Sequence, residues 1–119
     1  HLVFVLKYRR KGISERVLAN LRQSFETVCS DFDAELKECD GETDHVHLLV
    51  EYPPKVSISE LVNSLKGVSS RMVRRENYPE VQRVLWGDHF WSPSYFAASC
   101  GGAPLEILKT YIQHQAGCP

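Results

Sequence analysis

Two histidines separated by one residue, His45 and His47, carry the clearest chemical signal in this sequence. They lie in the segment DHVHLLVE at residues 44–51, whose apolar and β-branched character predicts a β-strand. Side chains alternate between the two faces of a strand, so both imidazoles should project from the same side. Two imidazoles in that arrangement can hold one divalent metal ion, although such a pair is often only a polar surface pair. The metal hypothesis therefore depends on which other groups reach this face.

A second group of candidate residues lies near the end of the chain. The segment from Pro104 to about Gln115 has the pattern of a last helix, and Tyr111 and Gln115 share one face of it because they are four residues apart. Gln115 offers an amide oxygen as a third metal ligand, and His114 is an alternative donor. Two imidazole nitrogens and an amide oxygen, with open positions left over, suit Mg²⁺ or Mn²⁺ better than a closed zinc site.

Tyr111 offers a nucleophile beside such a metal. The metal could bind a scissile phosphate and orient it for in-line attack. Attack by the phenol would leave a covalent phosphotyrosine that keeps the bond energy, so a strand could be rejoined without a nucleotide cofactor. The ordinary pKa of tyrosine is about 10, so the attack needs a nearby positive charge or a proton acceptor. The metal and a neighbouring Lys or Arg are both candidates for that role.

The expected elements follow the order β-α-β-β-α-β, with an extra helix at the end. Ser14 is a good N-cap for the first helix, and residues 57–60 match a capping box before the second. The order predicts an α+β fold, a ferredoxin-like or RRM-like sandwich whose additional C-terminal helix carries Tyr111. Strands are expected at 2–8, 32–39, 44–51 and 90–100, a hairpin turn at 40–42, and the last helix at about 103–116.

Two helices should cover one face of this sheet and leave the other face open. Val46, Leu48 and Val50 would then pack against the helices, while the two histidines would lie on the open face. An aromatic group at residues 86, 90, 91, 95 and 96 is expected mainly to fill the core, although one or two of its rings could stack on bases.

Composition and length set limits on the class of protein. The 119 residues form one expected domain, with a core over about 1–100, and 43% of them are hydrophobic, which suffices for one core. No apolar run is long enough to span a membrane, and no secretory signal is visible. The four cysteines show no C-x-x-C spacing, so we interpret them as reduced thiols of a cytoplasmic protein.

Several separate motifs, in the same order, resemble those of one protein family. The chain resembles the small single-tyrosine HUH transposases of bacterial insertion sequences and the related repeat-associated tyrosine transposases. The matching stretches are FVLKYRRK at 4–11, DHVHL at 44–48, SLKG at 64–67, LWG at 85–87, FWSPSY at 90–95 and YIQHQ at 111–115.

The resemblance implies a concrete set of roles. In such enzymes His45, His47 and Gln115 would hold the metal, and Tyr111 would be the nucleophile. The substrate would be single-stranded DNA with a hairpin near the ends of the element, cut to give a 5′-phosphotyrosine and a free 3′-OH. The protein would act as a homodimer in which the tyrosine helix can complete the partner's site, with a hinge at residues 101–102.

Charge is distributed in blocks, although the net charge is only -1. Two mostly basic segments flank an acidic one, and such blocks are either a solvated surface or a stripe that contacts phosphates. Given the implied substrate, the candidate DNA contacts are Lys7, Arg9, Arg10, Lys66, Arg71, Arg74 and Arg75.

Three other functions remain open at this level. An RRM-like module could bind single-stranded nucleic acid without cutting it, although such modules usually carry aromatic residues on the open sheet face. A metal-dependent phosphoesterase could use activated water and would need no tyrosine. A domesticated relative could process genomic repeat hairpins with the same chemistry.

Overall fold

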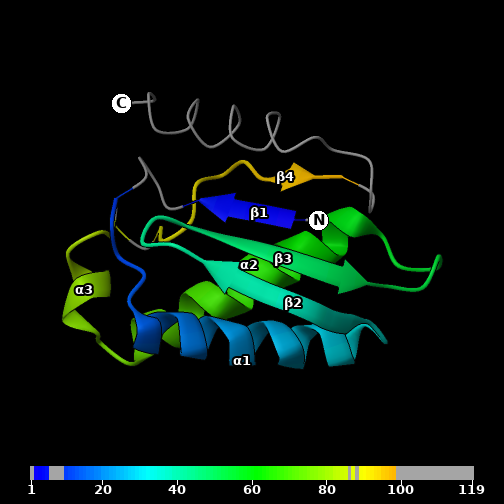
Figure 1. Cartoon of the computed structure of the whole chain (residues 1–119), viewed down its shortest axis with the longest axis horizontal. Helices are drawn as coiled ribbons and strands as arrows, with labels where there is room; N and C mark the ends of the chain where they lie inside the picture. Colours follow the sequence, from blue (N-terminus) through cyan, green and yellow to red (C-terminus); the bar gives the residue numbers. More distant parts are fainter. Residues whose placement is uncertain (1, 6–9, 86, 88, 99–119) are drawn as a thin grey trace.

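The histidine-bearing segment forms an inner strand of a four-stranded antiparallel sheet (Figure 1). This computed structural model describes residues 2–5, 10–85, 87 and 89–98, with the backbone alone for 2–5. The strands are β1 (Leu2–Val5), β2 (Glu35–Gly41), β3 (His45–Glu51) and β4 (Phe96–Ala97), in the spatial order β2-β3-β1-β4. Both edges of β3 are therefore hydrogen-bonded to neighbours, which holds its side chains in fixed positions.

Helices α1 (Glu15–Asp31) and α2 (Ile58–Arg75) lie together against one face of this sheet, and a short helix α3 (Pro79–Gln82) follows them (Figure 1). The class is therefore α+β, as predicted. The order of elements also follows the prediction through β4, apart from α3, which was not expected.

Local signals in the sequence set where both long helices begin. The hydroxyl oxygen of Ser14 accepts a hydrogen bond from the amide of Val17 at 3.3 Å, and that of Ser57 accepts one from the amide of Glu60 at 3.4 Å. Each cap satisfies one amide that the first turn of a helix leaves without a partner. Both predicted N-caps are confirmed.

The core lies between the sheet and the two helices. Val46 and Leu48 of β3 are fully buried there, as the alternation predicts, while Val50 is only partly buried. Burying each such side chain contributes about 1.5–3 kcal/mol to folding. Helix α1 supplies Val17, Leu21 and Phe25, and helix α2 supplies Leu61, Val62, Leu65 and Val73.

The segment before β4 also enters the core. Trp91 packs beside Phe25 with ring centroids 6.5 Å apart, and its indole nitrogen donates to the Ser69 hydroxyl at 3.0 Å. Phe90 is 1% exposed, so Phe90 and Trp91 fill the core as expected. The predicted strand over 90–100 is wrong for its first half, because Phe90 and Trp91 are buried in the core instead, and among the described residues the pairing with β1 is made by Phe96–Ala97.

The hairpin between β2 and β3 differs from its predicted position. Strand β2 begins three residues later than expected and extends through Gly41, which pairs with Val46. The turn therefore lies at 42–44 and is closed by a 3.0 Å hydrogen bond from the amide of Glu42 to the carbonyl of His45. This shift brings two acidic residues next to the first histidine.

Candidate metal centre

Strand β3 presents His45 and His47 on the face of the sheet opposite the helices. Both are partly buried, whereas the residues that alternate with them are fully buried under α1 and α2. The register sets His47 beside Val3 of β1 and Asp40 of β2. The predicted common face of the two imidazoles is confirmed.

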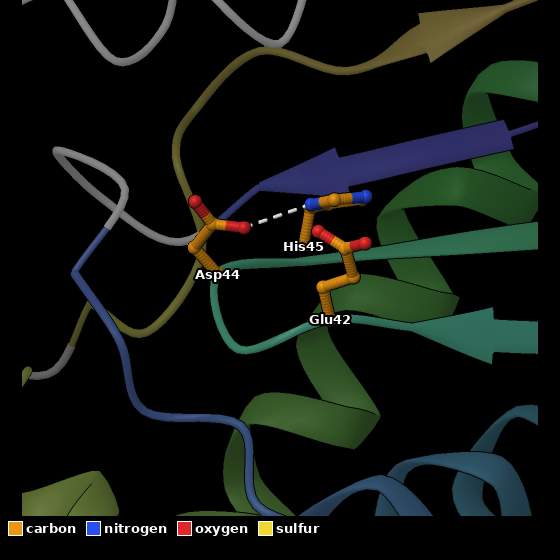
Figure 2. A group of neighbouring side chains, drawn as sticks. All are labelled: Glu42, Asp44 and His45. Carbon is orange, nitrogen blue, oxygen red and sulfur yellow. Dashed lines mark hydrogen bonds and ion pairs between the residues drawn. The ribbon is translucent and has the colours of Figure 1, made fainter.

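The ring of His45 is held by the carboxylate that precedes it. Nδ1 of His45 lies 2.8 Å from Oδ1 of Asp44, and Asp44 is only 6% exposed (Figure 2). With Asp44 ionised, Nδ1 carries the proton and donates it, so the lone pair of the neutral ring is on Nε2. Histidines that bind metals usually donate their second nitrogen to a carboxylate or carbonyl in this way, which fixes the tautomer and the ring orientation.

A second carboxylate comes from the same turn. Figure 2 shows the side chain of Glu42 beside the ring of His45. One potential ligand atom from each of Glu42, Asp44 and His45 lies within 4.8 Å of the other two. Glu42 is exposed and Asp44 is buried, so Asp44 is the natural orienting partner and Glu42 the residue open to an ion. Neither carboxylate was predicted as part of the site, although acidic residues immediately before an H-x-H pair were a usable signal.

The pKa of His47 is changed mainly by burial. Burial lowers its pKa below the ordinary value, and the carboxylates of Glu38 and Asp40 only partly oppose this. Its imidazole is therefore neutral at pH 7. Neutral imidazole is the form that binds a metal ion, so no proton has to be displaced from this ring.

The other predicted members of the site lie outside the described residues. These are the nucleophile Tyr111, the ligand Gln115, its alternative His114, the two hinge glycines and the basic residues Lys7 and Arg9. The convergence of Tyr111 and Gln115 on the two histidines therefore stays a prediction.

Lys66 has contacts that the sequence did not predict. Its ammonium donates to the backbone carbonyl oxygens of Ser92 at 2.6 Å and Ser94 at 3.1 Å. It thereby connects α2 to the segment that leads into β4. Burial lowers the pKa of Lys66 to about 8, so the side chain is still mostly charged at pH 7.

The remaining basic candidates on α2 differ in their surroundings. Arg71 and Arg75 are exposed, whereas Nε of Arg74 donates to the carbonyl and the hydroxyl of Ser70, each at 3.3 Å. Arg10, before α1, is partly buried. The exposed pair is therefore the part of this group best placed to meet a phosphate.

The cysteines within the described residues take no part in the site. Cys29 and Cys39 are buried free thiols, as predicted, and burial raises the pKa of Cys29 to about 11. Thiols with raised pKa values are poor nucleophiles and poor metal ligands at neutral pH. No helix among the described residues is both long and apolar enough to cross a membrane.

Comparison with known proteins identifies the family of the chain. The family described as "Transposase IS200 like" matches residues 1–115. The ISDra2 transposase TnpA of Deinococcus radiodurans is 30% identical over 115 residues, which cover 97% of this chain and 81% of that protein. The transposase for insertion sequence element IS200 of Salmonella typhimurium is also 30% identical, over 97% of this chain and 74% of its own length.

Solved structures give the same result at the level of the fold. A crystal structure of a putative transposase from Deinococcus radiodurans superposes with a TM-score of 0.79 at 26% identity, covering 98% of this chain and 89% of that one. A REP-associated tyrosine transposase bound to a REP hairpin has a TM-score of 0.60 at 16% identity, covering 95% of this chain and 59% of that one, and it shows similarity of fold alone. Fold and sequence thus define an α+β protein of the transposase class. The chain belongs to the IS200-like transposase family.

Proposed function

We propose that this protein is a metal-dependent transposase that cleaves and rejoins single-stranded DNA at hairpin-bearing element ends through a 5′-phosphotyrosine. The observation that carries the proposal is the arrangement on β3. Two imidazoles share one face, and the first is oriented by a buried carboxylate at 2.8 Å. Membership of the IS200-like family supplies the class of reaction.

In this proposal the protein has a single ferredoxin-like HUH domain over residues 1–119. The core would end near residue 100, and a hinge at 101–102 would lead to a tyrosine helix over about 103–116. The order β2-β3-β1-β4, with both long helices on one face, supports this description. The face that carries the histidines would then be covered by the tyrosine helix, in its own subunit or in the partner of a homodimer.

The residues of the turn and strand fit a divalent metal ion. Nε2 of His45, the neutral ring of His47 and the amide oxygen of Gln115 would hold it, and the exposed carboxylate of Glu42 offers a further oxygen. Nitrogen and oxygen donors without thiolates suit Mg²⁺ or Mn²⁺. When bound, the ion would supply positive charge that orients the scissile phosphate and offsets charge developing on its oxygens.

The chain's own nucleophile would carry the covalent step. The phenolic oxygen of Tyr111 loses its proton and forms a bond to phosphorus, and the bond from phosphorus to the 3′ oxygen breaks. The departing 3′ oxygen takes up a proton and becomes a hydroxyl. In the reverse direction a 3′-OH attacks the phosphotyrosine and releases Tyr111, so joining requires no nucleotide cofactor.

Basic side chains would hold the DNA through its phosphates. We assign this role to the exposed Arg71 and Arg75 first, with Lys7, Arg9, Arg10, Lys66 and Arg74 as further contacts. Phosphate contacts would make binding strongly dependent on salt. The related REP-associated tyrosine transposase is bound to a REP hairpin, which supports a hairpin as the DNA form to test.

The decisive experiment compares the wild type with Tyr111→Phe on labelled hairpin oligonucleotides in the presence of Mg²⁺ or Mn²⁺. We expect the wild type to form a covalent protein–DNA adduct that survives a denaturing gel. The variant should form no adduct and should retain hairpin binding, because only one oxygen atom is removed.

Cleavage at an unchanged rate by the variant would instead indicate a phosphoesterase that uses water. Binding by the wild type with no cleavage under any metal condition would indicate a binding module.

A further inference from the structure

A small hollow lies on the helix side of the molecule, away from the histidine face. It is formed between α2 and the segment that leads into β4, and it has a volume of about 210 Å³. That segment is anchored on the helix side, because Trp91 contacts Phe25 of α1 and Ser69 of α2. The sheet therefore separates the hollow from the two imidazoles. Its polar lining includes Lys66, Ser70, His89 and Ser92, with Gly67 and Pro93 beside them.

Two of the motifs noted in the sequence meet at this hollow. The stretches SLKG at 64–67 and FWSPSY at 90–95 both line it, and neither contains a proposed metal ligand or the nucleophile. They are joined by the hydrogen bonds from the ammonium of Lys66 to the carbonyls of Ser92 and Ser94. The proposed chemistry on β3 thus uses neither stretch.

Gly67 is unusual for its place in α2. It lies in the middle of an 18-residue helix, where glycine is less favourable than alanine. A Cβ built on it would meet nothing within 4 Å, so packing among the described residues does not require glycine here. The other common reason for glycine is the close approach of a bound group, and Gly67 is part of the wall of the hollow.

Basic side chains lie along the helix that forms one wall of the hollow. Helix α2 has no acidic residue after Glu60, and from its middle onward it carries Lys66, Arg71, Arg74 and Arg75. Arg71 is exposed and lies four residues after Gly67, so it shares that face of the helix. None of the described residues that line the hollow is acidic. This charge complements a polyanion rather than another protein surface.

We propose that the hollow binds one nucleotide of the DNA backbone, which packs on Gly67 with its phosphate near Lys66 and Arg71. The volume of about 210 Å³ is below the roughly 300–1,000 Å³ of sites for drug-sized ligands, so it suits the sugar and phosphate of one nucleotide, with the base outside. Because it lies across the sheet from the metal centre, this contact holds the DNA without taking part in cleavage. The inference rests on the proposed DNA substrate.

The test measures binding without cleavage. A fluorescein-labelled hairpin oligonucleotide with single-stranded flanks is titrated in EDTA against the wild type, Gly67→Leu, Gly67→Ala and the control Asn63→Leu. Asn63 is exposed, lies one turn earlier on α2 and does not line the hollow. We expect Gly67→Leu to weaken binding roughly tenfold, the size of one lost hydrogen bond to a charged group, because its side chain would fill the hollow. Gly67→Ala should raise the melting temperature and still weaken binding, whereas Asn63→Leu should leave binding unchanged.

Gly67→Ala should raise the melting temperature and weaken DNA binding at the same time. This combination separates a binding role from a structural one, because replacing a purely structural glycine would not give higher stability together with weaker binding. Arg71→Gln should lower the slope of log Kd against log salt by about 1, as loss of one phosphate contact predicts. Wild-type affinity in both Gly67 variants, or equal weakening by Asn63→Leu, overturns the hollow as a DNA site. The adduct assay with Tyr111 is unaffected by that result. Failure of the wild type to bind the hairpin overturns the DNA function itself and this inference with it.

Discussion

The two faces of strand β3 are built from alternate residues of one short segment, yet different forces determine them. On the helix side, Val46 and Leu48 are fully buried, and their contribution is to stability. On the open side, the His45 side chain is 16% exposed and is bonded to a buried carboxylate. One strand can therefore both anchor the core and present the site, because its side chains alternate between the two faces.

The two histidines on the open face differ in what prepares each ring to bind a metal ion. His45 is oriented by the carboxylate of Asp44, whereas burial keeps His47 neutral. A carboxylate partner raises the basicity of a ligand, and a neutral ring binds without displacing a proton. Substitutions on the open face should therefore change metal binding and cleavage, whereas substitutions on the helix face should change stability.

The largest effect should come from the open face. His45→Ala and His47→Ala each remove a proposed metal ligand, so cleavage should fall by more than about 100-fold, beyond the effect of losing an outer partner. Thermal unfolding should change little, because neither ring is part of the core. Adduct formation with and without excess Mn²⁺, beside a melting curve, measures both quantities. Full cleavage activity in EDTA would contradict a metal role.

The helix face should respond in stability instead. Leu48→Ala leaves a cavity under the helices and should lower the free energy of unfolding by about 2–5 kcal/mol. Leu48→Met keeps the volume and should cost less than about 1.5 kcal/mol. Urea denaturation measures both variants. A loss of activity in folded Leu48→Met comparable to that of His47→Ala would show that the two faces are not independent.

Substitution of Asp44 should have an effect of intermediate size, because Asp44 acts on the metal site by orienting the ring of His45. Asp44→Ala should weaken Mn²⁺ binding by about 10–100-fold, as loss of an outer partner of a ligand does. Asp44→Asn can still accept from Nδ1 and should lose less. Nitrogen-15 shifts of His45 in the metal-free protein report the tautomer directly. Protonation at Nδ1 in the wild type and a shift toward Nε2 in Asp44→Ala is the expected result, and an unchanged tautomer would remove Asp44 as the orienting group.

The smallest effect concerns a carboxylate remote from the site. Glu80 accepts from Arg16 at 2.6 and 2.8 Å and from the Ser14 hydroxyl at 2.6 Å, and these bonds hold its pKa well below the ordinary value. Its stabilising contribution is therefore present above its ordinary pKa of about 4.5 and is lost as the pH falls below it.

Glu80→Gln should accordingly lower the melting temperature at pH 7 and leave adduct formation unchanged. The difference from the wild type should shrink as the pH falls below about 4.5, because the unfolded chain then binds the proton that the folded one resists. Melting curves across this range measure it. A difference that stays constant with pH would mean that the ionised form of Glu80 is not what stabilises α3 against α1.

Local features account for the parts of the fold that the sequence predicted. The caps at Ser14 and Ser57, the helical spacing of apolar residues and the alternation around His45 each depend on neighbours within a few residues. The extent of β4 could not be predicted in this way. Its first half was lost because Phe90 and Trp91 find partners on α1 and α2, which are distant in sequence.

The amino-acid sequence by itself determined that two imidazoles would share one face of a buried strand, because alternation is a property of any extended backbone. It also identified the family through its motifs. Only the tertiary structure decided where the turn falls, which carboxylate orients His45, and that Lys66 connects α2 to the segment before β4. The bonds of Lys66 join segments 26 and 28 residues apart, so they form only when α2 and the segment before β4 pack together. The turn and the contact between Asp44 and His45 are local, but they follow from the register in which β2 pairs with β3 and from the burial of Asp44, which the residue types alone do not fix.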